Sequence, residues 1–189
     1  VGLSLVFGTM DVLNLAHGSI ALAGAYVGVA FLEVGGGLLP FAGAVLVALL
    51  VGAAAGLLLT VLTRRLQDHL QQALLTLGLA LVAADVLKQF FGADVESVPA
   101  PAALNGSVSI LGSAYPEYRL YIIVASLVIG TGLYLALERT QLGAIVRATV
   151  ADRNMVEALG IRTSVVLAGV FGIGAALAAL GGLLAGPVL

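Results

Sequence analysis

The pentapeptide Asn14-Leu15-Ala16-His17-Gly18 carries the residue types that could do chemistry inside a membrane. It lies in the segment Leu13–Leu32, which is otherwise almost wholly apolar. An amide and an imidazole are costly in hydrocarbon and are tolerated where they face a helix-bundle interior or a water-filled path. Transporters build substrate sites at helices broken in this way. We therefore expect Asn14, His17 and Gly18 to line a translocation path or to hold a broken helix beside it. The alternative is a polar helix start at a membrane edge.

A catalytic role for this histidine would need a nucleophile within hydrogen-bond reach. His17 and Ser19 are two residues apart and point to different helix faces, so a Ser–His dyad would have to recruit Ser126 from a separate segment. His17 and His69 lack metal-ligand spacing, and the absence of cysteine excludes thiolate metal sites and disulfides. No phosphate-binding Gly-x-x-x-x-Gly-Lys-[Ser/Thr] loop is present. We expect no catalytic residue, metal or cofactor, and an intramembrane enzyme stays the alternative from a different class.

Asp85 and Lys88 are the charged residues within another long apolar segment. An unpaired charge at the centre of a span costs about 2.5–3.5 kcal/mol on insertion scales. Three residues apart on a helix, the two side chains can neutralise each other, and a lysine can extend toward the membrane surface. We expect them to form a pair near the outer end of their span.

The segment 140–162 is a polar island between two uncharged apolar runs. Its composition predicts a helix between Gly143 and Gly160, with Gly160 as the C-terminal stop. One face is partly apolar and the other charged, and Arg153 and Glu157 are helical neighbours. Such a helix could dock in a groove of a partner protein and pass motion to the flanking spans. A surface-lying amphipathic connector and an ordinary positively charged loop are the alternatives.

The composition identifies the class of protein that must position these residues. Hydrophobic residues make up 61% of the 189-residue chain and charged residues 10%, against roughly 45–50% and about 25% in soluble domains. A soluble fold could not bury so many long apolar runs. The net charge of −2 says nothing about nucleic acid, but no basic patch is present, so we expect the lipid bilayer and not nucleic acid as a partner.

The apolar runs predict an all-α, polytopic transmembrane helix bundle with about five to six spans, since a span needs about 20 residues. We interpret residues 1–189 as a single transmembrane domain truncated at both ends, because both terminal runs stop inside apolar sequence. Before the fifth run, Asn105-Gly106 predicts the turn of a small hairpin. The expected segments are a partial helix Val1–Met10, then Leu13–Leu32, Phe41–Thr63, Ala73–Phe91, Leu120–Leu137 and Thr163–Leu189.

The positions of the arginines predict how the chain is oriented in the membrane, and the spacing of the glycines predicts where helices pack closely. Arg64 and Arg65 lie in one connection, and a group of four arginines lies in another connection two spans later. Both connections therefore fall on one side, which the positive-inside rule makes cytoplasmic. Glycines four apart at Gly24/Gly28, Gly52/Gly56 and Gly182/Gly186 predict close helix packing. The four arginines are Arg139, Arg147, Arg153 and Arg162.

Four blocks of sequence resemble the permease subunit of bacterial branched-chain amino acid ABC transporters, and together they cover nearly the whole chain. The pentapeptide is similar to the family's Asn-x-Ala-His-Gly signature, although Ser19 stands where the family often has an acidic residue. The blocks are Gly2–Gly8 with Asn14–Gly18 and Gly24-Ala25-Tyr26; Leu74–Leu79; Thr140–Gly143 with Arg147-Ala148, Asp152 and Ala158–Ile161; and Phe171–Ala176 with Ala179 and Gly182.

The resemblance implies a permease subunit of an ABC importer in the bacterial inner membrane, powered by a separate ATPase. It implies a second permease subunit, cytoplasmic ATP-binding subunits and a periplasmic solute-binding protein as partners. The substrate would be a branched-chain or related amino acid, with urea or a short amide as the alternative, because permeases for these solutes carry similar signatures. The segment 140–162 would be the ATPase-coupling helix. Its expected coupling residues are Gly143, Arg147, Ala148, Asp152, Glu157 and Gly160.

Overall fold

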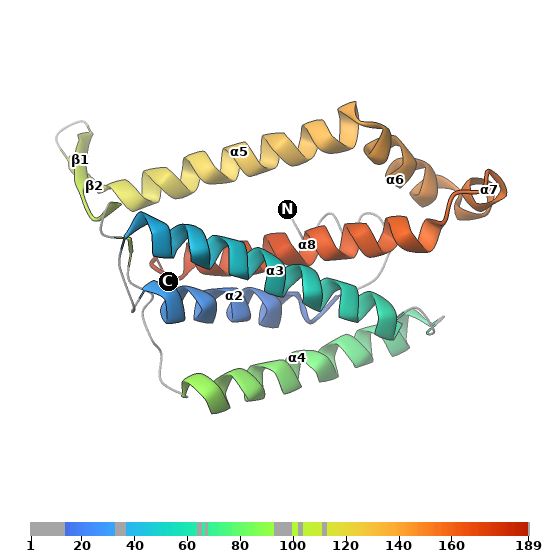
Figure 1. The fold of residues 1–189 in the computed structure, drawn as a ribbon, viewed down its shortest axis with the longest axis horizontal. Coiled ribbons are helices and arrows are strands. Elements are labelled where there is room, and N and C mark those ends of the chain that lie inside the picture. Colours follow the sequence, from blue (N-terminus) through green and yellow to red (C-terminus); the bar gives the residue numbers. More distant parts are fainter. Residues whose placement is uncertain are drawn as a thin grey trace.

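The computed structural model describes residues 14–32, 37–63, 66, 68–92, 100–101, 104–110 and 113–188, and shows a bundle of long helices with a small hairpin at one end (Figure 1). We call the two ends of the bundle the hairpin end and the α6–α7 end. The elements are α2 (His17–Leu32), α3 (Leu38–Thr63), α4 (His69–Phe91), β1 (Ser107–Ile110), β2 (Ser113–Pro116), α5 (Glu117–Arg139), α6 (Gln141–Ala151), α7 (Arg153–Ala158) and α8 (Thr163–Ala185).

The long apolar runs form the helices that the sequence predicts. Within the described residues, four helices are long and apolar enough to cross a membrane: α3, α4, α5 and α8. These helices confirm a polytopic membrane helix bundle. The expected span Leu13–Leu32 appears as the 16-residue helix α2, which begins only at His17. The expected partial helix Val1–Met10, and Arg64 and Arg65, lie outside the described residues.

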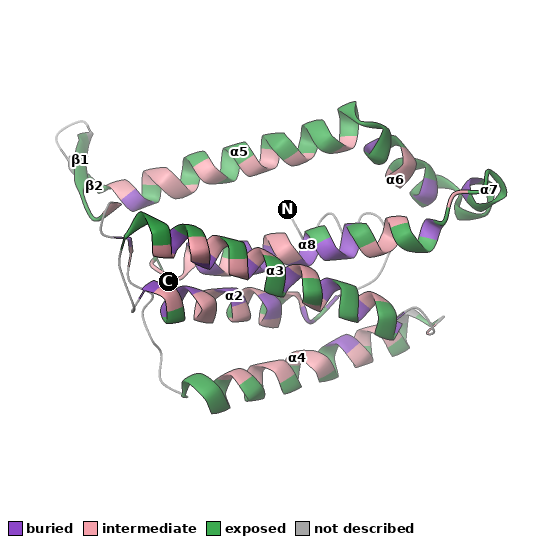
Figure 2. Cartoon of the chain, in the orientation of Figure 1, coloured by how far each residue is buried: buried purple, intermediate pink, exposed green. Residues whose placement is uncertain are grey.

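The core forms where α8 packs against both α2 and α3 (Figure 1). Burial is concentrated on α8, whereas α4 and α5 are largely exposed (Figure 2). Glycines let α3 approach α8 closely, because a Cβ at Gly52 would lie 2.5 Å from the carbonyl oxygen of Ala175, and one at Gly56 2.5 Å from that of Phe171. The predicted packing role of these glycines is confirmed.

The contact between α2 and α8 is closer still. A Cβ at Gly24 would overlap the carbonyl group of Ala179, and a Cβ at Gly182 would overlap that of Ala21. The two backbones therefore meet directly at this crossing, and any side chain larger than hydrogen would push them apart.

Helices α4 and α5 join the core at a few points. The Tyr118 hydroxyl, near the start of α5, donates a hydrogen bond to the Leu184 carbonyl at 3.0 Å. Nearby, the rings of Phe41 and Tyr121 meet edge to face at 5.9 Å between centroids. On the other side of the bundle, α4 contacts α2 through stacked rings of Tyr26 and Phe91, 4.7 Å apart. The loose packing of these two helices leaves room for cavities beside α8 and α3.

The predicted pair between Asp85 and Lys88 is not formed. Among the described residues, the ion pairs are Arg147 with Glu138 and Arg153 with Glu157. Asp85 and Lys88 are both exposed on α4. Lys88 lies three residues from the end of α4, so its side chain can extend to the polar boundary without a partner.

The small hairpin is present, but its turn is not at the predicted dipeptide. Strands β1 and β2 pair antiparallel, with Val108 opposite Tyr115 and Ile110 opposite Ser113, so the two strands are connected after Ile110. Asn105-Gly106 precedes the hairpin, where the Gly106 carbonyl accepts a hydrogen bond from the Glu117 amide at 3.0 Å. That bond joins the base of the hairpin to the start of α5.

Candidate functional site

The first three residues of the pentapeptide, Asn14–Ala16, form a tight turn before α2, which begins at His17. Asn14 is 4% exposed, and its Oδ1 accepts a hydrogen bond from the Ala16 amide at 3.1 Å. The Leu15 amide donates to the Thr76 hydroxyl on α4 at 3.2 Å. Side chains thus satisfy backbone donors that would otherwise be buried without partners. This bonding explains why the helix begins at His17 and not at Leu13.

Helix α2 begins partway along the bundle, well inside the ends of α3 and α8 (Figure 1). At that point His17 lines a half-open cavity of about 440 Å³ between α2, α5 and α8. The His17 Nδ1 is buried and has no hydrogen-bond partner among the described residues. A buried polar atom without a partner is costly, so the Nδ1 position is an unusual feature of this helix start. The rest of the wall is Ala21, Ile122, Ser126, Ile129, Leu177, Ala178, Leu180, Gly181, Gly182, Leu184 and Ala185.

The three residues expected at the path have different positions. Asn14 is buried in the turn and does not line this cavity, whereas His17 does. Gly18 is exposed, and a Cβ placed there would meet nothing within 4 Å. Ser126 is on the same cavity wall as His17, but no hydrogen bond between them is found in the described structure. The contact that a Ser–His dyad requires is therefore not formed.

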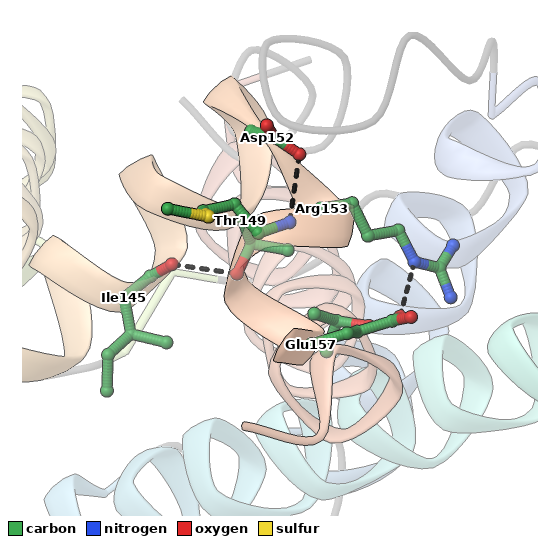
Figure 3. Close-up of polar contacts among 7 residues, drawn as sticks. Ile145, Thr149, Asp152, Arg153 and Glu157 are labelled. Atoms are coloured by element: carbon green, nitrogen blue, oxygen red, sulfur yellow. Dashed lines mark hydrogen bonds and ion pairs between the residues drawn. The ribbon is translucent and has the colours of Figure 1, made fainter. Parts of the chain in front are cut away.

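The segment expected to form one helix from Gly143 to Gly160 forms two helices, so that prediction is wrong in this detail. Asp152 separates them: its amide donates to the Ala148 carbonyl at the end of α6, and its Oδ1 accepts from the Met155 amide at 3.0 Å at the start of α7 (Figure 3). An aspartate that caps the next helix competes with continuation of the previous one. The predicted stop at Gly160 is confirmed by its φ of 81°.

The corner between α5 and α6 is tightly built. The Thr140 hydroxyl accepts from the Gly143 amide at 3.1 Å and donates to the Ala136 carbonyl at 2.5 Å. A Cβ at Gly143 would overlap the carbonyl group of Leu137. Arg147 donates to the same Leu137 carbonyl and lies 3.7 Å from the Glu138 carboxylate. Helix α6 is therefore joined to the end of α5 as one unit.

The junction between α7 and α8 is held by a carboxylate. Glu157 Oε1 accepts from Arg153 Nε at 3.0 Å (Figure 3) and from the hydroxyl of the buried Thr163, the first residue of α8. The hydrogen bond from Thr163, and then that from Arg153, hold the pKa of the Glu157 carboxyl below its usual range. The carboxylate therefore stays ionised and joins α7 to α8 near neutral pH.

The apolar face predicted for this segment is divided between core and surface. Thr149 and Val156 are buried, whereas Leu142 is 75% and Leu159 72% exposed. Of the expected coupling residues, Gly143 is buried, and Arg147, Ala148, Asp152, Glu157 and Gly160 are exposed. The exposed apolar residues leave a surface that a partner or lipid can cover.

Sequence reasoning gave no role to Thr76 or Thr163, whose side chains join separate elements in the structure. The sequence feature that could have identified them is a hydroxyl group within an apolar run, because a buried hydroxyl must find a hydrogen-bond partner. Its partner depends on tertiary packing and could not be named from spacing.

Comparison with known proteins places the sequence of this chain in a family. Residues 1–187 match the family model described as "Branched-chain amino acid transport system / permease component". The chain is 27% identical over 202 aligned residues to the high-affinity branched-chain amino acid transport system permease protein BraD of Pseudomonas aeruginosa. That alignment covers 98% of this chain and 64% of the relative, so the chain spans about two thirds of the relative's length. No solved structure matches the chain. Because the family model covers nearly every residue, the chain belongs to the family of branched-chain amino acid transport permease components.

Proposed function

We propose that this chain forms the membrane-spanning part of an ABC importer permease that carries branched-chain amino acids across the bacterial inner membrane. The match of residues 1–187 to the permease family carries the proposal. The substrate follows the relative from Pseudomonas aeruginosa, whose name specifies branched-chain amino acids and not urea or an amide. The chain would work with a second permease subunit, cytoplasmic ATP-binding subunits and a periplasmic solute-binding protein.

The cavity at His17 is the proposed part of the translocation path. Its volume of about 440 Å³ is within the range of about 300–1,000 Å³ usual for small-molecule sites. Ile122, Ile129 and Leu177 offer apolar contacts to an aliphatic side chain, and His17 and Ser126 are the polar side chains of the described cavity wall. The Asn14 turn supports this wall by fixing where α2 begins, and Gly18 follows on the exposed side of the helix.

The α6–α7 segment is the proposed coupling element, and the α6–α7 end is the cytoplasmic one. The arginines of the described part that lie at this end support the orientation. Exposed Leu142 and Leu159 would give affinity for the ATPase, and Arg147 and Asp152 would fix the register. Because α6 is joined to α5 and α7 to α8, movement of this segment would reach two of the three helices that line the His17 cavity.

His17→Leu is expected to lower the initial rate of ATP-driven leucine uptake about tenfold, which corresponds to a loss of ~1.4 kcal/mol along the path. The substitution removes the imidazole from the cavity wall and adds no bulk that the cavity cannot hold. Asn14→Leu should also lower uptake, by leaving the Ala16 amide without its acceptor. Uptake is measured in proteoliposomes that contain the full-length permease with its partner subunits.

Gln71→Leu is the matched control, because this exposed polar residue lies in the first turn of α4, away from the His17 cavity. It should keep wild-type uptake. Normal uptake by His17→Leu at equal membrane expression would show that His17 is not part of the translocation path. If Asn14→Leu lowers only the amount of protein in the membrane, Asn14 has a role in folding alone.

A further inference from the structure

The outer side of α4 is left uncovered by the described part of the chain. Helix α4 meets the bundle along one side, where Phe91 stacks on Tyr26 and where Leu79 and Ala80 pack against the core. Its opposite side lies at the edge of the bundle (Figure 1) and is exposed (Figure 2). We call this side the α4 outer stripe. Its residues are Gln71, Leu74, Gly78, Leu81, Asp85 and Lys88, and all of them are exposed.

The spacing of the α4 outer stripe is that of a helix–helix interface. Its members are alternately three and four residues apart, so they follow the heptad repeat along which two helices pack side by side. Gly78 lies in the middle, and a Cβ there would meet nothing within 4 Å. No contact within the described chain therefore requires this glycine. An exposed glycine on a membrane helix allows the backbone of a second helix to approach closely.

The α4 outer stripe also carries an acidic group that forms no ion pair with a described residue. Asp85 lies about 9 Å from the end of α4 at Phe91, at 1.5 Å per residue. Its short side chain cannot extend to the polar boundary as a lysine can. A carboxylate that faces hydrocarbon is costly, and charged groups inside membranes usually pair with one another. A cation from a second molecule would remove this cost.

The cation that fits is one helical turn away on the same stripe. Lys88 is exposed, and it also lies outside the ion pairs of the described residues. A two-fold axis along the membrane normal places two α4 helices side by side and parallel, with the same residues at the same depth. Asp85 of each copy then lies one turn from Lys88 of the other, and the contact is made twice. Because the helices cross at Gly78, they have begun to diverge at Asp85, which leaves room for the long lysine side chain.

We propose that two copies of this permease pair through the α4 outer stripe, crossing at Gly78, with Asp85 of each copy in an ion pair with Lys88 of the other. The inference deepens the proposed function and rests on its membrane-spanning orientation, because the second permease subunit is then a second copy of this chain. Charged residues at such positions fix the register of the two helices. No residue of the described His17 cavity wall belongs to α4, so each copy keeps its own cavity.

Cysteine crosslinking tests the pairing directly, because residues 1–189 contain no cysteine. The sample is the full-length permease in the membranes in which it is expressed, with every cysteine outside these residues replaced by serine. Mild oxidation should convert Leu81→Cys mainly to a disulfide-linked dimer. Leu127→Cys is the matched control, because Leu127 is 64% exposed against 65% for Leu81 but lies on α5. It should stay mainly monomeric.

Gly78→Leu blocks the close approach of the two helices. A Cβ at Gly78 meets nothing within 4 Å in the described chain, so each copy should keep its fold. Co-purification of two differently tagged copies should fall at least about tenfold. Gly132→Leu on α5 is the matched control, because a Cβ there also meets nothing within 4 Å. It should co-purify like the parent.

Exchange of charges identifies the ion pairs. Asp85→Lys gives the stripe two lysines, and Lys88→Asp gives it two aspartates. Each variant alone should lose co-purification, because like charges then face each other across the axis. Expressed together, the two variants should pair with each other as the parent does. An ion pair within one helix would not be restored by mixing two copies, so restoration excludes that alternative.

Absence of the Leu81→Cys dimer, parent-like co-purification of Gly78→Leu, or failure of the two folded charge variants to pair would overturn the proposal. Pairing of this chain only with a different permease subunit would overturn it as well. If the charge variants do not insert, the crosslink and the two glycine variants decide the question. None of these assays needs substrate or ATP, so absence of leucine uptake would contradict the proposed function and leave the pairing to be decided by itself.

Discussion

Gly182→Val is expected to abolish correct packing of α8, with a loss of at least about 3 kcal/mol in the free energy of unfolding. A Cβ at this position would overlap the carbonyl group of Ala21, and backbone cannot move aside as a flexible side chain can. The helices α2 and α8 would have to separate along the contact that forms the centre of the core. The measurement is the yield and the unfolding temperature of the detergent-solubilised protein.

Gly181→Val is the matched control, because a Cβ there meets nothing within 4 Å. It makes the same change in helix propensity and hydrophobicity one residue away. Equal destabilisation by the two variants would show that the loss comes from helix propensity and not from the α2–α8 contact.

Arg147→Glu is expected to reduce the leucine transported per ATP hydrolysed by roughly five- to tenfold, in keeping with usual coupling energies. The change removes the donor to the Leu137 carbonyl and places two carboxylates together at Glu138. Because Arg147 and Glu138 are both about half exposed, the loss of their ion pair costs little stability. The spans should therefore stay folded, while α6 no longer moves rigidly with α5.

Arg139→Glu provides the control for net charge, since Arg139 is exposed at the same end of α5 and forms none of the ion pairs in the described structure. It should keep normal coupling. Full coupling in Arg147→Glu, or equal loss in Arg139→Glu, would contradict a specific role for the α5–α6 corner.

Crosslinking can locate the partner of the coupling segment. Thr149 is buried and its hydroxyl donates to the Ile145 carbonyl at 2.8 Å, so a cysteine there would not reach a partner (Figure 3). Leu142 is 75% exposed and is the better position. A Leu142→Cys crosslink to the ATPase would support docking, whereas a crosslink to lipid alone would make the segment a surface connector.

The long helices were predictable because length and apolar composition determine them. The sequence placed the end of α3 at Thr63, the end of α4 at Phe91 and the start of α8 at Thr163, as the structure has them. These boundaries follow from local changes in polarity, which a single sequence displays directly. The stop at Gly160 was predictable for a similar reason, because glycine favours the left-handed conformation that ends a helix.

The features that the sequence did not predict depend on competition between helix capping and helix continuation, and on contacts between residues far apart in the sequence. Asp152 divides the coupling segment because its side chain caps α7, and helix propensity alone does not decide whether such a residue caps or continues. The late start of α2 depends on the Asn14 turn and on Thr76, 61 residues from Leu15. The His17 cavity lies where the middle of α5 is separated from α8. The periodicity of a sequence contains no information on the distance between two helices.

The most direct test of the account is uptake of radiolabelled L-leucine by proteoliposomes that contain the full-length permease, its ATP-binding subunits and its solute-binding protein. If the chain is a permease for branched-chain amino acids, leucine should accumulate against its gradient, and accumulation should depend on ATP at the α6–α7 side. Isoleucine and valine should compete with leucine, and urea should not. Accumulation of urea in place of leucine, or leucine movement that is independent of ATP, would contradict it.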